Sequence, residues 1–238
     1  MTIDELTLEV LADKALSQFD SKKLVSWAVS VLELGYENEN LFILAGLDFD
    51  STEEREHYFW KSIADLKLNV EKTEEQLLEK YAQAIANRAI EKKISIEYAF
   101  QQMNRIVSAS GYDSKYLAFY EINEDLEYLK YENKTIYHSG LTTENANEFI
   151  FEEFRFFALM EDLKIPQEFR NQCYCQRCKK LNIPVTRNKF QLKRPFRYAV
   201  STCGICGSEK LKHSSDHEVK WIIINEYKKA MLNAHVFS

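Results

Sequence analysis

The sequence predicts a mainly α protein: a multi-helix bundle or short helical solenoid, then a small β zinc ribbon, then a closing C-terminal segment that we expect to be a helix. Three observations predict this fold class. Apolar residues recur at helical spacing, behind N-cap signals, through the first 165 residues. Two C-x-x-C motifs follow in the C-terminal third. The formal charge changes sign at the point where the cysteines begin.

The helical region is marked by N-cap signals and apolar stripes. Three capping-box pairs open helices: Thr2 with Glu5, Ser51 with Glu54, and Thr73 with Gln76. Simple caps are expected at Ser21 and Ser95. The helix opened by Thr73 carries one apolar stripe, formed by Leu78, Tyr81, Ala82, Ile85, Ala86, Ala89 and Ile90. These patterns predict about eight helices with short connections, which favours antiparallel packing of consecutive helices.

The helix expected over residues 145–163 is unusually rich in phenylalanine. Its apolar residues are more than one stripe needs: Phe149, Ile150, Phe151, Phe154, Phe156, Phe157 and Met160. We therefore expect this helix to pack on several sides or to contact the C-terminal region. A closing helix is expected over residues 216–234, although the segment 221–224 (WIII) is also typical of a strand.

Part of the helical region resembles a known group. The segments 23–36 (KLVSWAVSVLELGY) and 41–48 (LFILAGLD) resemble a group of small bacterial helical proteins, and the likeness continues through 81–86 (YAQAIA) and 94–100 (ISIEYAF). It covers about residues 21–106. The activity of that group is uncharacterised, so the resemblance implies a helical protein of bacterial or phage origin and no reaction.

The charge divides the chain into two regions. Residues 1–170 contain 18 Lys and Arg against 33 Asp and Glu, a net charge of −15. Residues 171–238 contain 13 against 4, a net charge of +9. We expect an acidic all-helical domain over residues 1–165 and a basic zinc-ribbon domain with a C-terminal helix over residues 166–238, each with its own partners.

The cysteines predict a structural Zn²⁺ site. Two C-x-x-C motifs separated by 24 residues are typical of a zinc ribbon, in which each motif forms a tight knuckle and four thiolates complete a tetrahedron; the ligands are Cys175, Cys178, Cys203 and Cys206. Gly204 and Gly207 suit the second knuckle, whereas the first has Gln176 and Lys179 at the matching places. Iron bound as in rubredoxin is the rival interpretation. Cys173 is expected to be a partly buried spare thiol.

The region between and around the knuckles is basic. Eight cations and no acidic residue occur from residue 171 to residue 208: Arg177, Lys179, Lys180, Arg187, Lys189, Lys193, Arg194 and Arg197. Aromatic residues stand among them, at Tyr174, Phe190, Phe196 and Tyr198. This pattern fits nucleic-acid binding, in which cations contact phosphates and rings stack on bases. It fits equally a small ribbon core whose cations face a protein partner or the chain's own acidic domain.

Nothing in the sequence names a reaction. No Gly-rich phosphate loop and no H-E-x-x-H motif occurs, so we expect no nucleotide cofactor and no enzyme. We expect His213 and His217, four residues apart, to be solvated surface residues; ligands of a second metal ion are the alternative. Glu152 and Glu153 are neighbours on a helix and therefore point in different directions. The longest apolar run has seven residues, 41–47, and the N-terminus is acidic, so we expect a cytoplasmic protein that does not contact membranes.

These features predict a non-enzymatic interaction protein, an adaptor or regulator that binds a macromolecular partner, protein or nucleic acid. The basic ribbon and the acidic helical surface would provide the binding sites. An inhibitor is the alternative: an acidic helical domain can occupy the basic groove of a nucleic-acid-processing enzyme, as bacterial immunity and phage anti-defence proteins do.

Overall fold

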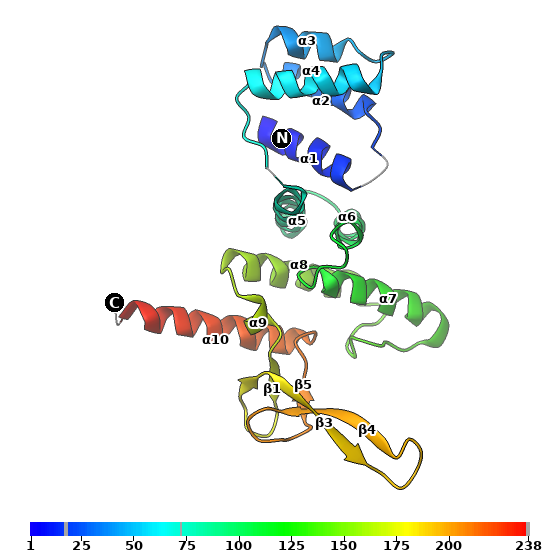
Figure 1. The fold of residues 1–238 in the computed structure, drawn as a ribbon, viewed down its shortest axis with the longest axis vertical. Coiled ribbons are helices and arrows are strands. Elements are labelled where there is room, and N and C mark those ends of the chain that lie inside the picture. The colour runs from blue at the N-terminus through cyan, green and yellow to red at the C-terminus, as the bar shows by residue number, and fades with distance from the viewer. Residues whose placement is uncertain (17–18, 72, 237–238) are drawn as a thin grey trace. The chain divides into compact units, whose positions relative to one another are not determined.

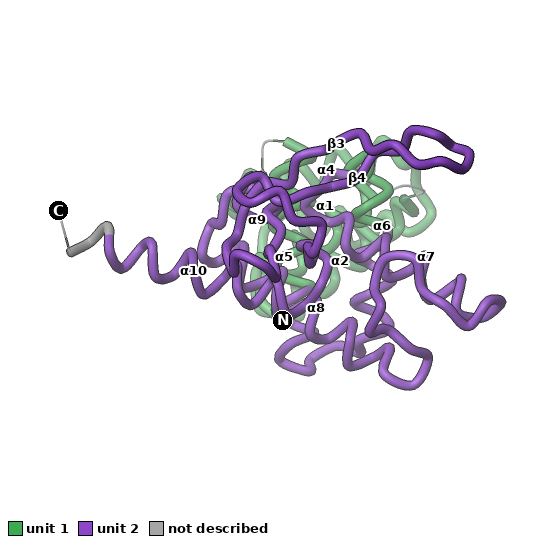
Figure 2. The backbone as a smooth tube through the Cα atoms, turned by 90° about the horizontal axis from the view of Figure 1, so that it is seen from below, with its two compact units in different colours: residues 1–85, 105–112 green, residues 86–104, 113–238 purple. Residues whose placement is uncertain are grey.

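The computed structural model describes residues 1–16, 19–71 and 73–236, which form ten helices and five short strands (Figure 1). The chain divides into two compact units (Figure 2). Unit 1 comprises residues 1–85 and 105–112, and unit 2 comprises residues 86–104 and 113–238. No helix in the described part of the chain has the length and apolar character needed to cross a membrane.

The helices follow one another with short connections. Four lie in unit 1: α1 (Ile3–Ala15), α2 (Lys22–Glu33), α3 (Glu39–Ala45) and α4 (Thr52–Asp65). Two have residues assigned to each unit: α5 (Glu74–Ile90) and α6 (Ile96–Ala109). Four belong to unit 2: α7 (Leu117–Glu132), α8 (Ala146–Asp162), α9 (Gln167–Arg170) and α10 (His217–Val236).

The predicted N-caps are confirmed at the starts of α1, α4 and α5, and the full reciprocal capping box is present at α1. The amides of Glu5, Glu54 and Gln76 donate to the hydroxyl groups of Thr2, Ser51 and Thr73, each over 3.2 Å. Six of the seven stripe residues of α5 are buried and the seventh, Ile90, is half-buried. Burial of one helical face, rather than propensity alone, stabilises such helices.

Unit 1 has a core built by consecutive helices. Helices α1 to α4 pack on one another through apolar side chains. The Trp27 indole of α2 meets the Phe59 ring of α4 edge-on, with centroids 4.8 Å apart. Its Nε1–H donates to the Thr7 hydroxyl of α1 over 3.1 Å, so the buried polar end of the ring is satisfied.

Ser21 stands at the N-cap position of α2 but its side chain does not cap the helix, which corrects the sequence prediction. Its side chain makes no cap hydrogen bond, and the Lys22 amide donates instead to the Asp20 carboxylate over 3.0 Å. The Ser21 hydroxyl accepts a 2.8 Å hydrogen bond from the buried guanidinium group of Arg55. Arg55 also donates to the carbonyl groups of Leu47 and Asp48. A buried cation needs several hydrogen-bond acceptors, and the Ser21 hydroxyl group is one of the acceptors of Arg55.

The core of unit 2 confirms that the Phe-rich helix α8 packs against both α7 and the C-terminal region. Phe154 of α8 and Phe119 of α7 have ring centroids 4.8 Å apart. On its other side, α8 shares an apolar cluster with α10, formed by Phe156, Met160, Ile165, Val219, Ile223 and Ile224. The segment 221–224 is therefore helical and not a strand.

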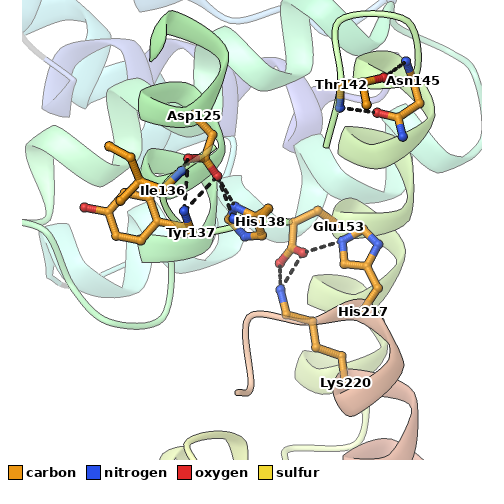
Figure 3. Close-up of polar contacts among 9 residues, drawn as sticks. All are labelled: Asp125, Ile136, Tyr137, His138, Thr142, Asn145, Glu153, His217 and Lys220. Atoms are coloured by element: carbon orange, nitrogen blue, oxygen red, sulfur yellow. Dashed lines mark hydrogen bonds and ion pairs between the residues drawn. The ribbon is translucent and has the colours of Figure 1, made fainter. Parts of the chain in front are cut away.

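Two buried carboxylates stabilise unit 2 (Figure 3). Asp125 of α7 accepts backbone N–H groups of Ile136, Tyr137 and His138, and also contacts Nδ1 of His138 at 2.9 Å. Glu153 of α8 contacts the Lys220 ammonium group of α10 through both carboxylate oxygens, at 2.5 and 2.6 Å. The first carboxylate fixes the loop after α7, and the second joins α8 to α10.

The ribbon contains two small antiparallel sheets. Strands β2 (Leu181–Asn182), β1 (Cys173–Cys175) and β5 (Leu211–Lys212) form one sheet in that order. Strands β3 (Pro184–Phe190) and β4 (Arg197–Cys203) form a hairpin that starts at the pair Pro184–Cys203 and ends at the pair Phe190–Arg197. A mainly α fold with a small ribbon and a closing helix is thus confirmed. The predicted boundary at residue 165 concerns composition and remains a prediction.

Candidate metal centre and basic hairpin

The first knuckle follows strand β1. The Lys179 amide donates to the Cys175 carbonyl over 2.8 Å, and the Cys175 amide donates to the Lys180 carbonyl over 3.0 Å. These bonds close the turn that carries Cys175 and Cys178. Lys179 adopts a φ of 57°, in the left-handed region that favours glycine. Position 179, where the first knuckle has lysine and the second has glycine, is therefore one whose backbone conformation favours glycine.

The second knuckle repeats this arrangement at the end of β4. The Gly207 amide donates to the Cys203 carbonyl over 2.9 Å, and the Cys203 amide donates to the Ser208 carbonyl over 2.8 Å. Gly207 has a φ of 71°, the counterpart of Lys179. Gly204 is required for a different reason: a Cβ atom there would lie 2.7 Å from the Ile183 carbonyl oxygen. The two glycines thus have separate roles in one turn.

The two knuckles bring the four predicted ligands together. The Sγ atoms of Cys175, Cys178, Cys203 and Cys206 all lie within 4.8 Å of one another. Two of the separations are 3.6 Å, from Cys175 to Cys206, and 3.7 Å, from Cys178 to Cys203. Four sulfurs bound at the usual zinc–sulfur distance in a tetrahedron lie about 3.8 Å apart. The donor set and its spacing therefore fit a single tetrahedral metal ion.

The thiols of the cluster differ in how readily they ionise. The Cys178 backbone N–H lowers the pKa of the Cys175 thiol to about 6, whereas burial raises the pKa of the Cys178 thiol to about 12. Burial opposes ionisation of Cys203, but the N–H groups of Cys206 and Ile205 outweigh it and lower the pKa. A divalent cation among the sulfurs would favour the thiolate in all four residues.

Cys173 lies outside the cluster. It is fully buried, not partly as expected, and its Sγ–H donates to the Asn182 carbonyl over 3.3 Å. Burial raises the pKa of its thiol. Cys173 and Cys175 share one face of β1, but only Cys175 stands at the entrance of a knuckle.

Asn182 is a component of this site that the sequence reasoning missed. Its side chain is buried between the knuckles, where Oδ1 accepts the Gly204 amide over 2.9 Å. Its Nδ2 donates to the carbonyl groups of Cys173 and Lys180. Nothing in the local sequence marks this asparagine, because its role depends on the pairing of β2 with β1.

Comparison of the chain with protein-family models, with curated proteins and with solved structures finds no match. The resemblance of residues 21–106 to a bacterial helical group is therefore not supported by a family match. The evidence about function comes from the chain itself.

The eight predicted basic residues divide between two places. Three surround the first knuckle: Arg177, Lys179 and Lys180. Five lie on the β3–β4 hairpin or its tip: Arg187, Lys189, Lys193, Arg194 and Arg197. All except the half-buried Lys189 are exposed. Among the residues that the structure describes, only Lys189 of the eight forms an ion pair, with Glu209 of the same ribbon.

The aromatic rings of the hairpin do not form a core of the ribbon. The interpretation of these rings as core residues, one of the two drawn from the sequence, is therefore wrong. Phe190 is 71% exposed and Phe196 is 56% exposed, while Leu192 at the tip is 99% exposed. The Arg197 guanidinium group lies 4.8 Å from the centroid of Phe190, its cross-strand partner. Tyr174, by contrast, packs against the α8–α10 cluster.

The expectation that His217 is a solvated surface residue is wrong. Its ring stacks on Phe149 with centroids 3.9 Å apart, and its Nε2 lies 3.3 Å from the Glu153 carboxylate. It therefore belongs to the junction of α8 and α10, whereas His213 is exposed. Glu152 and Glu153 diverge as expected: Glu152 pairs with Arg155 at 2.7 Å, and Glu153 is buried.

Proposed function

We propose that this chain is a non-enzymatic zinc protein that binds nucleic acid through its β3–β4 hairpin. Zinc is the ion that best suits four closely spaced thiolates in a closed tetrahedron. Because all four positions are filled by protein, the ion would stabilise the ribbon and leave no site for substrate.

The observation that carries the proposal is the joint exposure of cations and aromatic rings on one hairpin. Lys193, Arg194 and Arg197 lie at the tip or next to it, together with the exposed rings of Phe190 and Phe196. Exposed cations neutralise phosphates, and exposed rings provide stacking platforms for unpaired bases. This combination favours a single strand, because duplex bases are already stacked.

The length of the hairpin suits such contact. Strands of seven residues extend for about 23 Å. Figure 1 shows β3 and β4 extending beyond the sheet that carries the first knuckle. The Pro184–Cys203 pair at its base adjoins the metal centre, so the bound ion would hold the hairpin in place.

The experiment is fluorescence anisotropy of labelled single- and double-stranded DNA and RNA against the full-length protein, over a salt series. We expect single strands to bind more tightly than duplexes, with affinity falling steeply as salt rises. Neutralising three tip cations, K193Q/R194Q/R197Q, should flatten the log–log salt slope by about 2.

A matched control neutralises three exposed lysines of other segments, K92Q/K134Q/K228Q. It should change affinity and slope far less than the tip variant. Equal effects of the two variants, or no binding at low salt, would overturn the nucleic-acid proposal. A partner protein would then be the occupant of the hairpin. Loss of folding in the tip variant alone would mean that these cations pair with the chain's own acidic region.

A further inference from the structure

A cavity of about 370 Å³ lies in unit 2, at the place where the helices meet the ribbon. Its walls come from the segment before α7, from α7, α8 and α9, from the loop between β5 and α10, and from the first turn of α10. This volume is within the range of small-molecule sites. No residue of the β3–β4 hairpin lines the cavity, so a ligand there would act independently of the proposed nucleic-acid site.

The cavity is lined by more cations than carboxylates. Lys115, Arg170 and Lys220 face it, against Glu121 and Glu153. All three cations are largely buried, since their side chains are 20%, 14% and 7% exposed. Glu161 lies behind the lining and contacts both Lys115 and Arg170, so the three cations are matched by three carboxylates.

Two of these cations are fixed in neighbouring positions by one carboxylate. Glu161 contacts the Lys115 ammonium group at 2.8 Å through one oxygen and the Arg170 guanidinium group at 2.7 Å through the other. Arg170 also donates to the carbonyl groups of Ile165 and Met160. Glu161 itself does not line the cavity. The two cations are thus held together by a carboxylate that leaves the cavity free, which is the preorganisation that a binding site needs.

The remaining lining is partly apolar. Leu117, Phe157 and Met160 contribute side chains next to the charged groups. Glu121 makes no hydrogen bond or ion pair with any residue that the structure describes. Burial raises the pKa of its carboxyl group. An apolar cavity with convergent polar groups and a perturbed carboxyl is typical of a ligand site.

We propose that this cavity binds a small organic carboxylate. Its carboxylate group would contact Lys115 and Arg170, and its apolar body would pack against Leu117, Phe157 and Met160. Lys115 and Arg170 both reach the carboxylate of Glu161, so they lie close enough for one ligand carboxylate to contact both. A phosphate monoester carries nearly two charges near neutral pH and would be repelled by Glu121 and Glu153.

The test uses three probes that share a phenyl ring and differ in charge: benzoate, benzyl alcohol and benzylammonium. Binding to the full-length protein is followed by amide chemical shifts. We expect benzoate to bind with a Kd of about 1 mM, as a ligand this small allows. Benzyl alcohol should bind more weakly, and benzylammonium should not bind. Equal binding of benzoate and benzylammonium, or no binding of benzoate, would overturn the proposal.

Variants locate the site. Lys115→Gln removes one of the two cations that would contact the ligand and should weaken benzoate binding about tenfold, the effect of losing one charged hydrogen bond. Lys134→Gln, an exposed lysine outside the cavity, is the control and should bind as the wild type. Glu121→Gln should strengthen binding, since it removes a repelling charge. Unchanged affinity in both cavity variants would place benzoate elsewhere and refute the assignment.

Filling the cavity provides a test that does not depend on charge. Ala118 lines it, and Ala118→Phe should abolish benzoate binding. If that variant fails to fold, the pair of charge variants still decides the question.

Discussion

Asn182 and Gly204 join the two knuckles: the side-chain Oδ1 of Asn182 accepts a 2.9 Å hydrogen bond from the Gly204 backbone N–H. The same side chain donates to the carbonyl groups of Cys173 and Lys180, on the side of the first knuckle. A single buried amide therefore sets the spacing between the two halves of the metal centre. Hydrogen bonds just behind the metal ligands orient those ligands and tune metal affinity.

Asn182→Ala should therefore weaken metal binding without removing a ligand. It leaves the Gly204 amide without its acceptor and removes the hydrogen bonds to the carbonyl groups of Cys173 and Lys180, at a cost of about 1–3 kcal/mol. We expect the metal to be lost to a competing chelator at a roughly tenfold lower chelator concentration. Asn188→Ala, an exposed residue of β3, is the matched control. Identical metal retention in the two variants would show that the Asn182 bridge has no energetic role.

Serine variants can distinguish the four predicted metal ligands from Cys173, the thiol outside the cluster. Cys203→Ser should lose the bound metal, lower the melting temperature and reduce solubility, because the ribbon is too small to fold on its core alone. Cys173→Ser should retain a single metal ion per chain, since its Sγ lies outside the four-sulfur cluster. Metal content measured by elemental analysis decides between zinc and iron. Metal loss in Cys173→Ser, or a stable metal-free Cys203→Ser, would contradict the assignment.

Lys179 occupies a backbone conformation that suits glycine. Its φ of 57° corresponds to the φ of 71° at Gly207 in the other knuckle. We expect Lys179→Gly to raise the free energy of unfolding of the metal-bound protein by about 1 kcal/mol, because the left-handed strain is relieved. Lys180→Gly should not stabilise, since Lys180 has no positive φ to relieve. Thermal unfolding of both variants makes the comparison, and destabilisation by Lys179→Gly would contradict it.

The features predicted from sequence are those encoded over short spans. A capping box requires two residues three apart, and a knuckle requires two cysteines three apart, so both are visible in the chain itself. Asn182, Arg55 and His217 gain their roles from partners that only the fold brings close. The ion pair of Glu153 with Lys220 joins residues 67 apart in sequence. The sequence could not predict that the hairpin rings are exposed either, because an aromatic residue in a strand is found in cores as well as on binding faces.

The pair of Glu153 and Lys220 makes a prediction about pH. Burial opposes ionisation of Glu153, but the Lys220 ammonium group, with His217, outweighs it and lowers the pKa of Glu153 from 4.5 to about 2. A carboxyl whose pKa is lower in the folded state stabilises the fold above its unfolded pKa, and that stability disappears as the pH falls toward the folded value. The pair should therefore contribute about 3 kcal/mol at pH 7. Most of this is lost between about pH 4.5 and pH 2.

Glu153→Gln tests this directly. At neutral pH it leaves Lys220 buried without its counter-charge and should destabilise unit 2 by about 3 kcal/mol. The difference from wild type should shrink as the pH is lowered to about 2, where half of the wild-type carboxyl groups are also protonated. Glu152→Gln, whose residue pairs with Arg155 at a more exposed position, should cost less than about 1 kcal/mol at every pH.

Replacing both partners distinguishes two contributions to stability: the cost of leaving one buried charge unpaired, and the net stabilisation that the ion pair provides. The double variant Glu153→Leu with Lys220→Met buries apolar groups where the ion pair was, and we expect its stability at pH 7 to be close to wild type. Denaturant unfolding of the three variants from pH 7 to pH 2 gives the answer. A double variant as unstable as Glu153→Gln would mean that the ion pair itself, and not the avoidance of an isolated buried charge, holds α8 to α10.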